Sequence, residues 1–282
     1  METQTRNDEG QSQANRLKQI TDEALESLCL SLEEGKSDEL MQYLDVMAKF
    51  SKYSFRNMIL IFAQMPTASK VMGFHSWKKL NRQVKKGEKA IRIWAPMNLK
   101  TEDCDRVGRD SQAETGSESD RSLIFRPVCV FDVSQTEGEP LPEISNVSGE
   151  PGEYLHHLKD FTEELGINVG YSDNLQGDGV SKCGEILLRV GLAPAVEFHV
   201  LVHELAHELI HLKDYRISLS KKQAETEAEA VAYVVSQTIG LNMGHAASDY
   251  IQLYNGDHAT LRESLEVVQR TASRITQALI SA

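Results

Sequence analysis

The sequence predicts an α+β protein of two domains, and three observations carry that prediction. Apolar residues recur at helical spacing over several long segments, shorter segments alternate like strands, and residues 135–152, rich in Glu, Pro, Gly and Ser, divide the chain. With 282 residues, the chain is long enough for two domains that each bury a core. Its 40% apolar and 26% charged residues are typical of a globular protein.

The predicted division places an N-terminal extension, partly disordered, at residues 1–36. An α+β domain follows at 37–142 and contains an acidic loop at 100–122. A linker at 143–152 then leads to a second α+β domain at 153–282.

The N-terminal half begins with helical patterns. Periodic apolar residues predict a helix at 16–32, and Ser37 is expected to cap a second helix that continues to residue 47. Residues 54–65 predict a buried helix that Pro66 ends, and a short helix is expected at 77–81. Residues 90–94 alternate like a strand that Pro96 closes, and residues 123–133 resume strand character after the polar loop.

Beyond the linker, the pattern changes to helices around a small sheet. A helix is predicted at 154–165 and strands at 167–171 and 184–190, and three further helices begin near residues 195, 221 and 248. No apolar run approaches the roughly 18 residues that cross a bilayer, and the first residues lack the apolar core of a signal peptide. The four cysteines are widely spaced and are expected to be reduced thiols, so we expect a cytoplasmic location.

The charge is distributed unevenly. The net charge is −12, yet residues 51–100 hold eleven Lys or Arg and one acidic residue, Glu88, so this segment alone is +10. Cations interleaved with aromatics favour binding of single-stranded nucleic acid, because cations follow the phosphates and aromatic rings stack on bases. The alternative is that the aromatics are core residues and the lysines only keep the domain soluble. The predicted DNA-binding residues are Tyr53, Arg56, Lys70, Trp77, Lys78, Lys79, Arg82, Lys85, Lys86, Lys89 and Arg92.

The segment 198–213 carries the motif HELAH on an apolar helical pattern. His203 and His207 lie four residues apart, so both imidazoles leave one face of a helix and can reach one ion. Glu204 lies beside them, where its carboxylate can accept a proton from water. The alternative is a buried helix in which HExxH occurs by chance.

A catalytic zinc site needs a third protein ligand. Glu225 and Glu229 share one face of a predicted helix, so one can be the ligand and the other can support a histidine, and spacing alone leaves the two roles interchangeable. Glu227 points the opposite way and is expected on a solvated face. The alternative for all three glutamates is an exposed acidic helix start.

Three further residues near the motif are not predicted to belong to the site. His199 and His211 continue its four-residue spacing, but such residues are more often core or rim histidines. Tyr215 can donate a proton to a developing oxyanion or serve as a packing aromatic.

Residues 51–97 (SKYSFRNMILIF…AIRIWAPM) closely resemble the N-terminal single-stranded-DNA-binding domain of the ArdC family of antirestriction proteins, and residues 125–142 resemble the end of that domain. HELAH and ETEAEAVAYVV are similar to the zincin-like metallopeptidase domain of ArdC-type proteins and, more distantly, to the ImmA/IrrE group. The resemblance implies a Zn²⁺ peptidase of a plasmid or other mobile element that protects incoming DNA. It also implies Glu225 as the third ligand and Glu229 as its support.

The sequence hypothesis is therefore a zinc metallopeptidase fused to a single-stranded-DNA-binding domain, with a DNA-associated protein as its substrate. One alternative is a protein that coats single-stranded DNA and holds a structural zinc. Another is a regulatory protease that cleaves a repressor.

Overall fold

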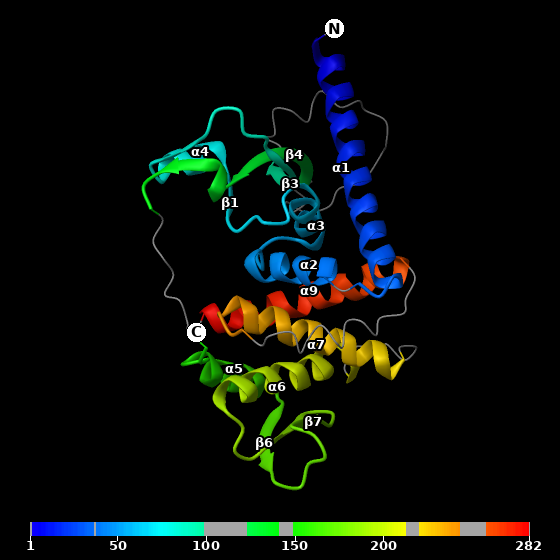
Figure 1. Ribbon diagram of the computed structural model, residues 1–282, viewed down its shortest axis with the longest axis vertical. Coiled ribbons are helices and arrows are strands. Elements are labelled where there is room, and N and C mark those ends of the chain that lie inside the picture. The colour runs from blue at the N-terminus through cyan, green and yellow to red at the C-terminus, as the bar shows by residue number, and fades with distance from the viewer. Residues whose placement is uncertain are drawn as a thin grey trace, which may run out of the picture.

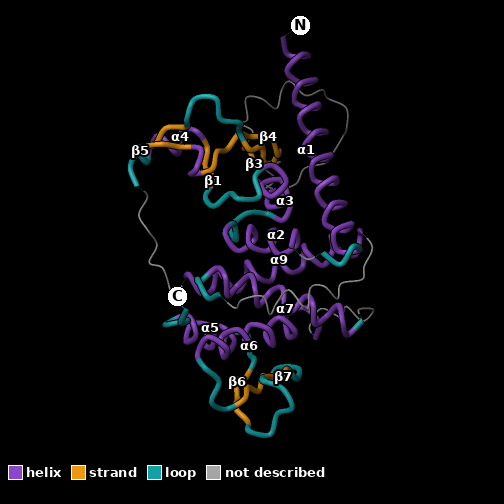
Figure 2. The backbone as a smooth tube through the Cα atoms, viewed as in Figure 1, coloured by secondary structure: helices purple, strands orange, loops and turns teal. Residues whose placement is uncertain are grey.

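Two groups of strands lie at opposite ends of the molecule, and helices fill the space between them (Figure 2). The computed structural model describes residues 2–36, 38–98, 123–140, 149–212, 220–242 and 258–281. Its mixture of helices with small sheets confirms the predicted α+β class.

The elements follow one another in two groups, separated by the predicted linker. The N-terminal group is α1 (Glu2–Glu33), α2 (Asp38–Lys49), α3 (Phe55–Gln64), β1 (Val71–Gly73), α4 (Phe74–Lys79), β2 (Arg82–Val84), β3 (Ile91–Asn98), β4 (Leu123–Asp132) and β5 (Thr136–Gly138). The C-terminal group is α5 (Tyr154–Glu164), β6 (Asn168–Ser172), β7 (Gly179–Ser181), β8 (Glu185–Arg189), α6 (Pro194–Ala206), a π-helix (His207–Leu212), α7 (Lys221–Thr238) and α9 (His258–Ser281).

The N-terminal sheet is antiparallel, with strand order β1-β4-β3. The register pairs Ile91 with Val130 and continues to Asn98 opposite Leu123. Because side chains alternate along a strand, one face carries the buried residues Ile91, Ile93 and Val130. That face belongs to the core shared with α3.

Helix α3 also caps the edge of the sheet at β3. The Asn57 side chain accepts from the Trp94 amide and donates to its carbonyl, both at 2.8 Å. Two turns later, Gln64 makes the same pair of bonds to Arg92, at 2.9 and 3.0 Å. These two amide side chains occupy main-chain groups that would otherwise offer an open edge to another strand.

Asp132 ties the end of β4 to the loop before β1. Its carboxylate is 1% exposed and accepts from the amides of Ser69 (2.7 Å), Lys70 (2.9 Å) and Ser134 (2.9 Å). Burial alone would raise the pKa of this carboxyl, but the bonds from Lys70, Ser134 and Ser69 outweigh burial and lower it.

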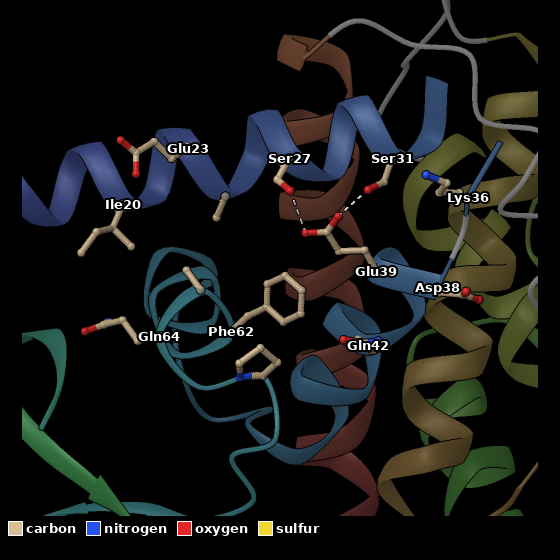
Figure 3. A pocket seen from close by; sticks show the side chains of 13 residues that line it. Ile20, Glu23, Ser27, Ser31, Lys36, Asp38, Glu39, Gln42, Phe62 and Gln64 are labelled. Atoms are coloured by element: carbon tan, nitrogen blue, oxygen red, sulfur yellow. Dashed lines mark hydrogen bonds between the residues drawn. The ribbon is translucent and has the colours of Figure 1, made fainter. Parts of the chain in front are cut away.

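Helix α1 differs from the predicted extension at residues 1–36, because it packs as part of the fold. Leu17, Leu25 and Leu28 are buried in the common core, and α1 contacts α3, β4 and α9. A groove of about 680 Å³ runs between α1, α2 and α3. In it, Glu39 accepts hydrogen bonds from two hydroxyls of α1 (Figure 3). Much of the predicted extension therefore belongs to the N-terminal core.

The C-terminal group builds a three-stranded sheet of order β6-β8-β7, in which β6 is parallel and β7 antiparallel to β8. Figure 1 shows α2, α9, α7 and α6 as successive layers between this sheet and the N-terminal one. Helices α2 and α7 pack together, as do α7 and α9. The two halves of the chain therefore meet through a broad helical interface.

Hydrogen bonds reinforce that interface. Side chains of α7 and α9 reach α2 and the loop after it: Tyr233 Oη to Asp45 Oδ1 (2.7 Å), Thr238 Oγ1 to Ala48 O (3.1 Å), Gln269 Nε2 to Tyr53 O (3.1 Å) and Ser273 Oγ to Ser51 O (2.7 Å). None of the described helices has the length and hydropathy to span a bilayer.

Candidate metal centre

The HELAH motif lies where α6 passes into the π-helix. Pro194 begins α6, as its fixed φ allows at a first helical position. Phe198, Leu201 and Val202 are fully buried, so the inner face of the helix is anchored in the core. The wider turn from residue 207 onward changes the direction of the side chains, and such turns are frequent at functional sites.

Three ligand atoms converge on one point. His203 Nε2 lies 3.1 Å from His207 Nε2, and Glu225 Oε2 lies 3.4 Å from the first and 3.5 Å from the second. Three atoms at a tetrahedral ion with bonds of about 2.0–2.1 Å would lie about 3.3 Å apart. Among the described residues, this trio is the group able to hold a metal ion.

Glu229 takes a different place from Glu225. Its carboxylate lies between His203 Nδ1 (3.1 Å) and His199 Nε2 (3.2 Å), and its side chain is 10% exposed against 37% for Glu225. It therefore faces the far nitrogen of His203, not the point where the Nε2 atoms meet. This geometry favours Glu225 as the ligand and Glu229 as its support.

Burial, hydrogen bonds and neighbouring charges shift the pKa values of the clustered side chains in different directions. Burial opposes charge on His203, but its hydrogen bonds to Glu225 and Glu229 raise its pKa to about 9. Burial and the adjacent His203 charge lower the pKa of His207 to about 4. The hydrogen bond from His203 holds the pKa of Glu225 at about 2, and bonds from His199 and His203 overcome burial and hold that of Glu229 at about 2. Neutral His207 and ionised Glu225 have the protonation states that metal ligands need, whereas His203 has to release its Nε2 proton when an ion binds.

Glu204 lies beside the trio and is only 8% exposed. Burial raises its pKa above the usual value, against the His203 charge and hydrogen bonds from Ser181. The approach of β7 is close: a Cβ on Gly179 would lie 2.8 Å from Glu204 Cγ and 2.6 Å from Val200 Cγ1. Sequence reasoning missed both β7 residues, because nothing in a three-residue strand points to a helix that begins thirteen residues later.

His211 and Glu227 also belong to the centre, which corrects two predictions. The predicted solvated position of Glu227 is wrong, since this residue is 1% exposed and α9 covers it. It bonds to His211 Nε2 (3.2 Å) and accepts from Ser264 Oγ of α9. His211 Nδ1 in turn lies 3.0 Å from His207 Nδ1.

His199 does not belong to the predicted site either, yet it forms a second chain of this kind. Its ring joins Glu229 to Ser236 Oγ, which lies 3.2 Å from Nδ1. Each metal-facing histidine is thus backed by a carboxylate, His203 directly and His207 through another imidazole. The unbroken four-residue spacing from His199 to His211 is the sequence signal that could have revealed both chains.

The prediction that Trp77 contacts DNA is wrong. Its side chain is fully buried, and Nε1 donates to the Phe131 carbonyl at 2.8 Å. Arg82 is also engaged, since its guanidinium bonds to the Thr136 side chain (2.9 Å) and carbonyl (3.2 Å) and so holds β5. Tyr53 donates to the Val71 carbonyl at 3.2 Å.

Most of the other predicted DNA-binding residues are accessible. Exposed side chains are Arg56, Lys78, Lys79, Lys85, Lys86 and Lys89, and half-buried ones are Tyr53, Lys70, Arg82 and Arg92. Lys85 Nζ also donates to the Ser134 carbonyl at 2.8 Å. Tyr215, the acidic loop at 100–122 and the predicted helix start at 248 lie outside the described residues.

Residues 13–131 match the family described as the N-terminal domain of the anti-restriction factor ArdC. This match assigns the N-terminal part of the chain to the ArdC N-terminal domain family. The ArdC match begins inside α1, in agreement with the packing of that helix against α3.

The ArdC fold extends over both halves of the chain. Two crystal structures of the antirestriction ArdC protein from plasmid R388 each cover 93% of this chain at 16% identity. The metal-free one gives a TM-score of 0.56 over 98% of its own length, and the Mn(II)-bound one gives 0.54 over 97%. An uncharacterised Bacillus anthracis protein, pXO2-81, is 24% identical over 84% of this chain. The chain spans 47% of the length of that relative.

Proposed function

We propose that this protein is a divalent-metal peptidase, with zinc as the metal, whose N-terminal domain binds single-stranded DNA in an antirestriction role. The observation that carries the peptidase is the meeting of His203 Nε2, His207 Nε2 and Glu225 Oε2 within 3.5 Å, with Glu204 beside them. Two imidazoles and a carboxylate form the donor set of many catalytic zinc sites.

The residues present fit a divalent cation. Glu229 accepts from His203 Nδ1, and His211 faces Nδ1 of His207, so each ligating imidazole can direct an unprotonated Nε2 toward the ion. The Mn(II)-bound ArdC structure supports a divalent cation, and the nitrogen-rich donor set favours zinc. When bound, zinc supplies Lewis acidity that polarises a carbonyl oxygen and lowers the pKa of water.

Glu204 is the general base of the proposed reaction. Its carboxylate takes a proton from the attacking water and delivers it to the leaving amine nitrogen. The raised pKa brings the group closer to the range in which it can both accept and release a proton. Ser181 orients the carboxylate from β7, and the absence of a side chain at Gly179 leaves it space.

Strand β7 also offers a path for a peptide substrate. Among the described strands, β7 lies at one edge of its sheet, with β8 on one side only. An extended peptide that pairs with the other side would pass Glu204. Main-chain pairing of this kind binds peptides with limited dependence on their side chains.

The DNA-binding part of the proposal rests on the basic segment. Residues 51–100 carry a charge of +10 in a chain of net charge −12, and six of the predicted cations are exposed. Binding through phosphates is independent of sequence. The peptidase would thereby be held close to proteins that act on single strands, such as those that process entering DNA.

The test is cleavage of a general protein substrate by zinc-loaded protein, with and without single-stranded DNA. Glu204→Gln is the matched control, because it keeps the size of the side chain and leaves all three ligands in place. We expect cleavage to fall by about 10²- to 10⁴-fold in this variant, the usual contribution of a general base. Zinc content, measured by mass spectrometry, should be equal in the two proteins.

Cleavage that is unchanged by Glu204→Gln would refute the assigned chemistry. Absence of cleavage by zinc-loaded wild-type protein under both conditions, with DNA binding intact, would favour a DNA-coating protein with a structural metal. Cleavage that is indifferent to DNA would favour a regulatory protease.

A further inference from the structure

The outer face of the N-terminal sheet, opposite the α3 side, is rich in aromatic and apolar side chains and has no buried residue. The register of β1, β4 and β3 places these residues on it: Met72, Arg92, Trp94, Pro96, Phe125, Pro127, Cys129 and Phe131. Each of them is half-buried or exposed, whereas Ile91, Ile93 and Val130 on the inner face are buried. These eight residues form the outer sheet face.

Two aromatic residues occupy diagonal positions on this face. Trp94 is opposite Pro127, and Phe125 is two residues away from Pro127 along β4, a diagonal relation in which Cα atoms lie about 7–8 Å apart. Phe125 is 57% exposed, the largest value among the exposed large hydrophobic residues that the structure describes. More than half of this ring faces water, and exposed apolar residues mark binding surfaces when they cluster.

The helices around the sheet leave this part of the face open. Helix α4 packs beside β1 and β4, and its Trp77 donates to the Phe131 carbonyl, so α4 borders the face at the β1 end. Helix α1 passes β4 without covering Phe125. Within the described part of the chain, Phe125 is exposed on this face, and Trp94 beside it is half-buried because it also packs against the core.

The charge around the patch fits a polyanion. Arg92 lies on the same face, two residues from Trp94, and Lys89 is exposed just before β3. Glu88 is the one acidic residue among positions 51–100. Stacking rings flanked by cations on an open sheet are the combination that binds single strands of any sequence.

We propose that the outer sheet face binds single-stranded DNA, with Trp94 and Phe125 stacking on bases and Arg92 pairing with the phosphate chain. This inference rests on the proposed DNA-binding function and locates it. It replaces the buried Trp77 with Trp94 as the indole that meets a base, and it adds Phe125, which the basic segment did not contain.

The two tryptophans of the chain make a direct test possible. Trp77 is buried and Trp94 is on the face, so stacking should quench the emission of Trp94 alone. An oligothymidylate of about 16 nucleotides is titrated into the full chain, and binding is followed by anisotropy of a labelled strand and by tryptophan emission. We expect saturable quenching with the same midpoint as the anisotropy change, and no quenching in Trp94→Phe.

Phe125→Ala provides an independent arm, because an exposed side chain can be removed without loss of the fold. Its affinity for the oligonucleotide should fall about 5- to 150-fold, the range for loss of one stacked base. Tyr171→Ala, which removes an exposed aromatic from β6, is the matched control and should bind as wild type. Melting temperatures of all variants identify any that fail to fold.

Three outcomes would overturn the proposal, and they can be told apart. Normal DNA binding with no quenching and no effect of Phe125→Ala would mean that the DNA binds to another surface of the protein, and the DNA-binding function would stand. Absence of binding even at low ionic strength would remove that function as well. A dimer that Phe125→Ala dissociates, with unchanged DNA affinity, would identify the outer sheet face as a protein interface.

Discussion

Replacement of His211 by phenylalanine tests whether the second imidazole positions the first. The ring keeps its approximate size, but His207 Nδ1 loses the partner at 3.0 Å and Glu227 loses the one at 3.2 Å. The His207 side chain is 14% exposed, so its N–H group has little access to water. An unsatisfied buried donor costs about 1–3 kcal/mol, and loss of a partner behind a ligating histidine weakens metal binding about 10- to 100-fold.

The assay is zinc affinity by competition with a chromogenic chelator, together with the visible spectrum of the cobalt-substituted protein. We expect affinity to fall about 10- to 100-fold and the cobalt bands to change, because the His207 ring is freer to rotate. His157→Phe is the matched control, since this imidazole contacts the Leu279 carbonyl at 3.4 Å away from the centre. Wild-type zinc affinity and an unchanged cobalt spectrum in a folded His211→Phe protein would refute the reasoning.

Three further predictions follow from other contacts. Gly179→Ala should displace Glu204 and so lower peptidase turnover about 100-fold, while zinc affinity stays unchanged. The control is Gly177→Ala, whose Cβ would have its nearest contact at 3.6 Å and which should be active. Equal activities of the two variants would contradict the close approach of β7 to Glu204. Asp132 has a lowered pKa in the folded state, so its stabilising contribution is complete above the unfolded pKa of about 3.8 and is lost as pH falls from there through the lower folded pKa. Denaturant titrations of wild type and Asp132→Asn should therefore differ by a constant amount above the unfolded pKa and converge below the folded one. A difference that is independent of pH would count against the assignment. Asn57→Ala leaves the Trp94 main chain unpaired and should destabilise the protein by about 1–3 kcal/mol, measured by urea unfolding; an unchanged midpoint would mean that water replaces the amide.

Sequence patterns within a single segment predicted the features that depend on that segment alone. The apolar periodicity that predicts a helix near residue 195 follows from burial of one face, and α6 begins at Pro194. Because His203 and His207 are four residues apart on that helix, both side chains leave the same face. The sequence also limited the third ligand to two glutamates, because a spacing of four residues places both on one face of α7. The spacing does not say which of the two faces the ion.

The remaining features depend on parts of the chain that meet only after folding. Glu227 is buried because α9 places Ser264 against it, 37 residues later. Trp77 is buried because β4 brings the Phe131 carbonyl to its indole, 54 residues later. The strand β7 has three residues, too few for any periodicity to show. These contacts join residues that are far apart in the sequence, so no pattern within one helix or strand predicts them.

Helix α7 limits how freely the two halves can be exchanged between proteins. Its first turns supply the glutamates of the centre, and later turns bond through Tyr233 and Thr238 to α2. Recombination that joined residues 153–282 to an unrelated partner would leave the α2-facing sides of α7 and α9 in water and the ligand-bearing helix without its support. The two halves are therefore expected to be inherited together, and replacement of one half should require compensating changes along α7.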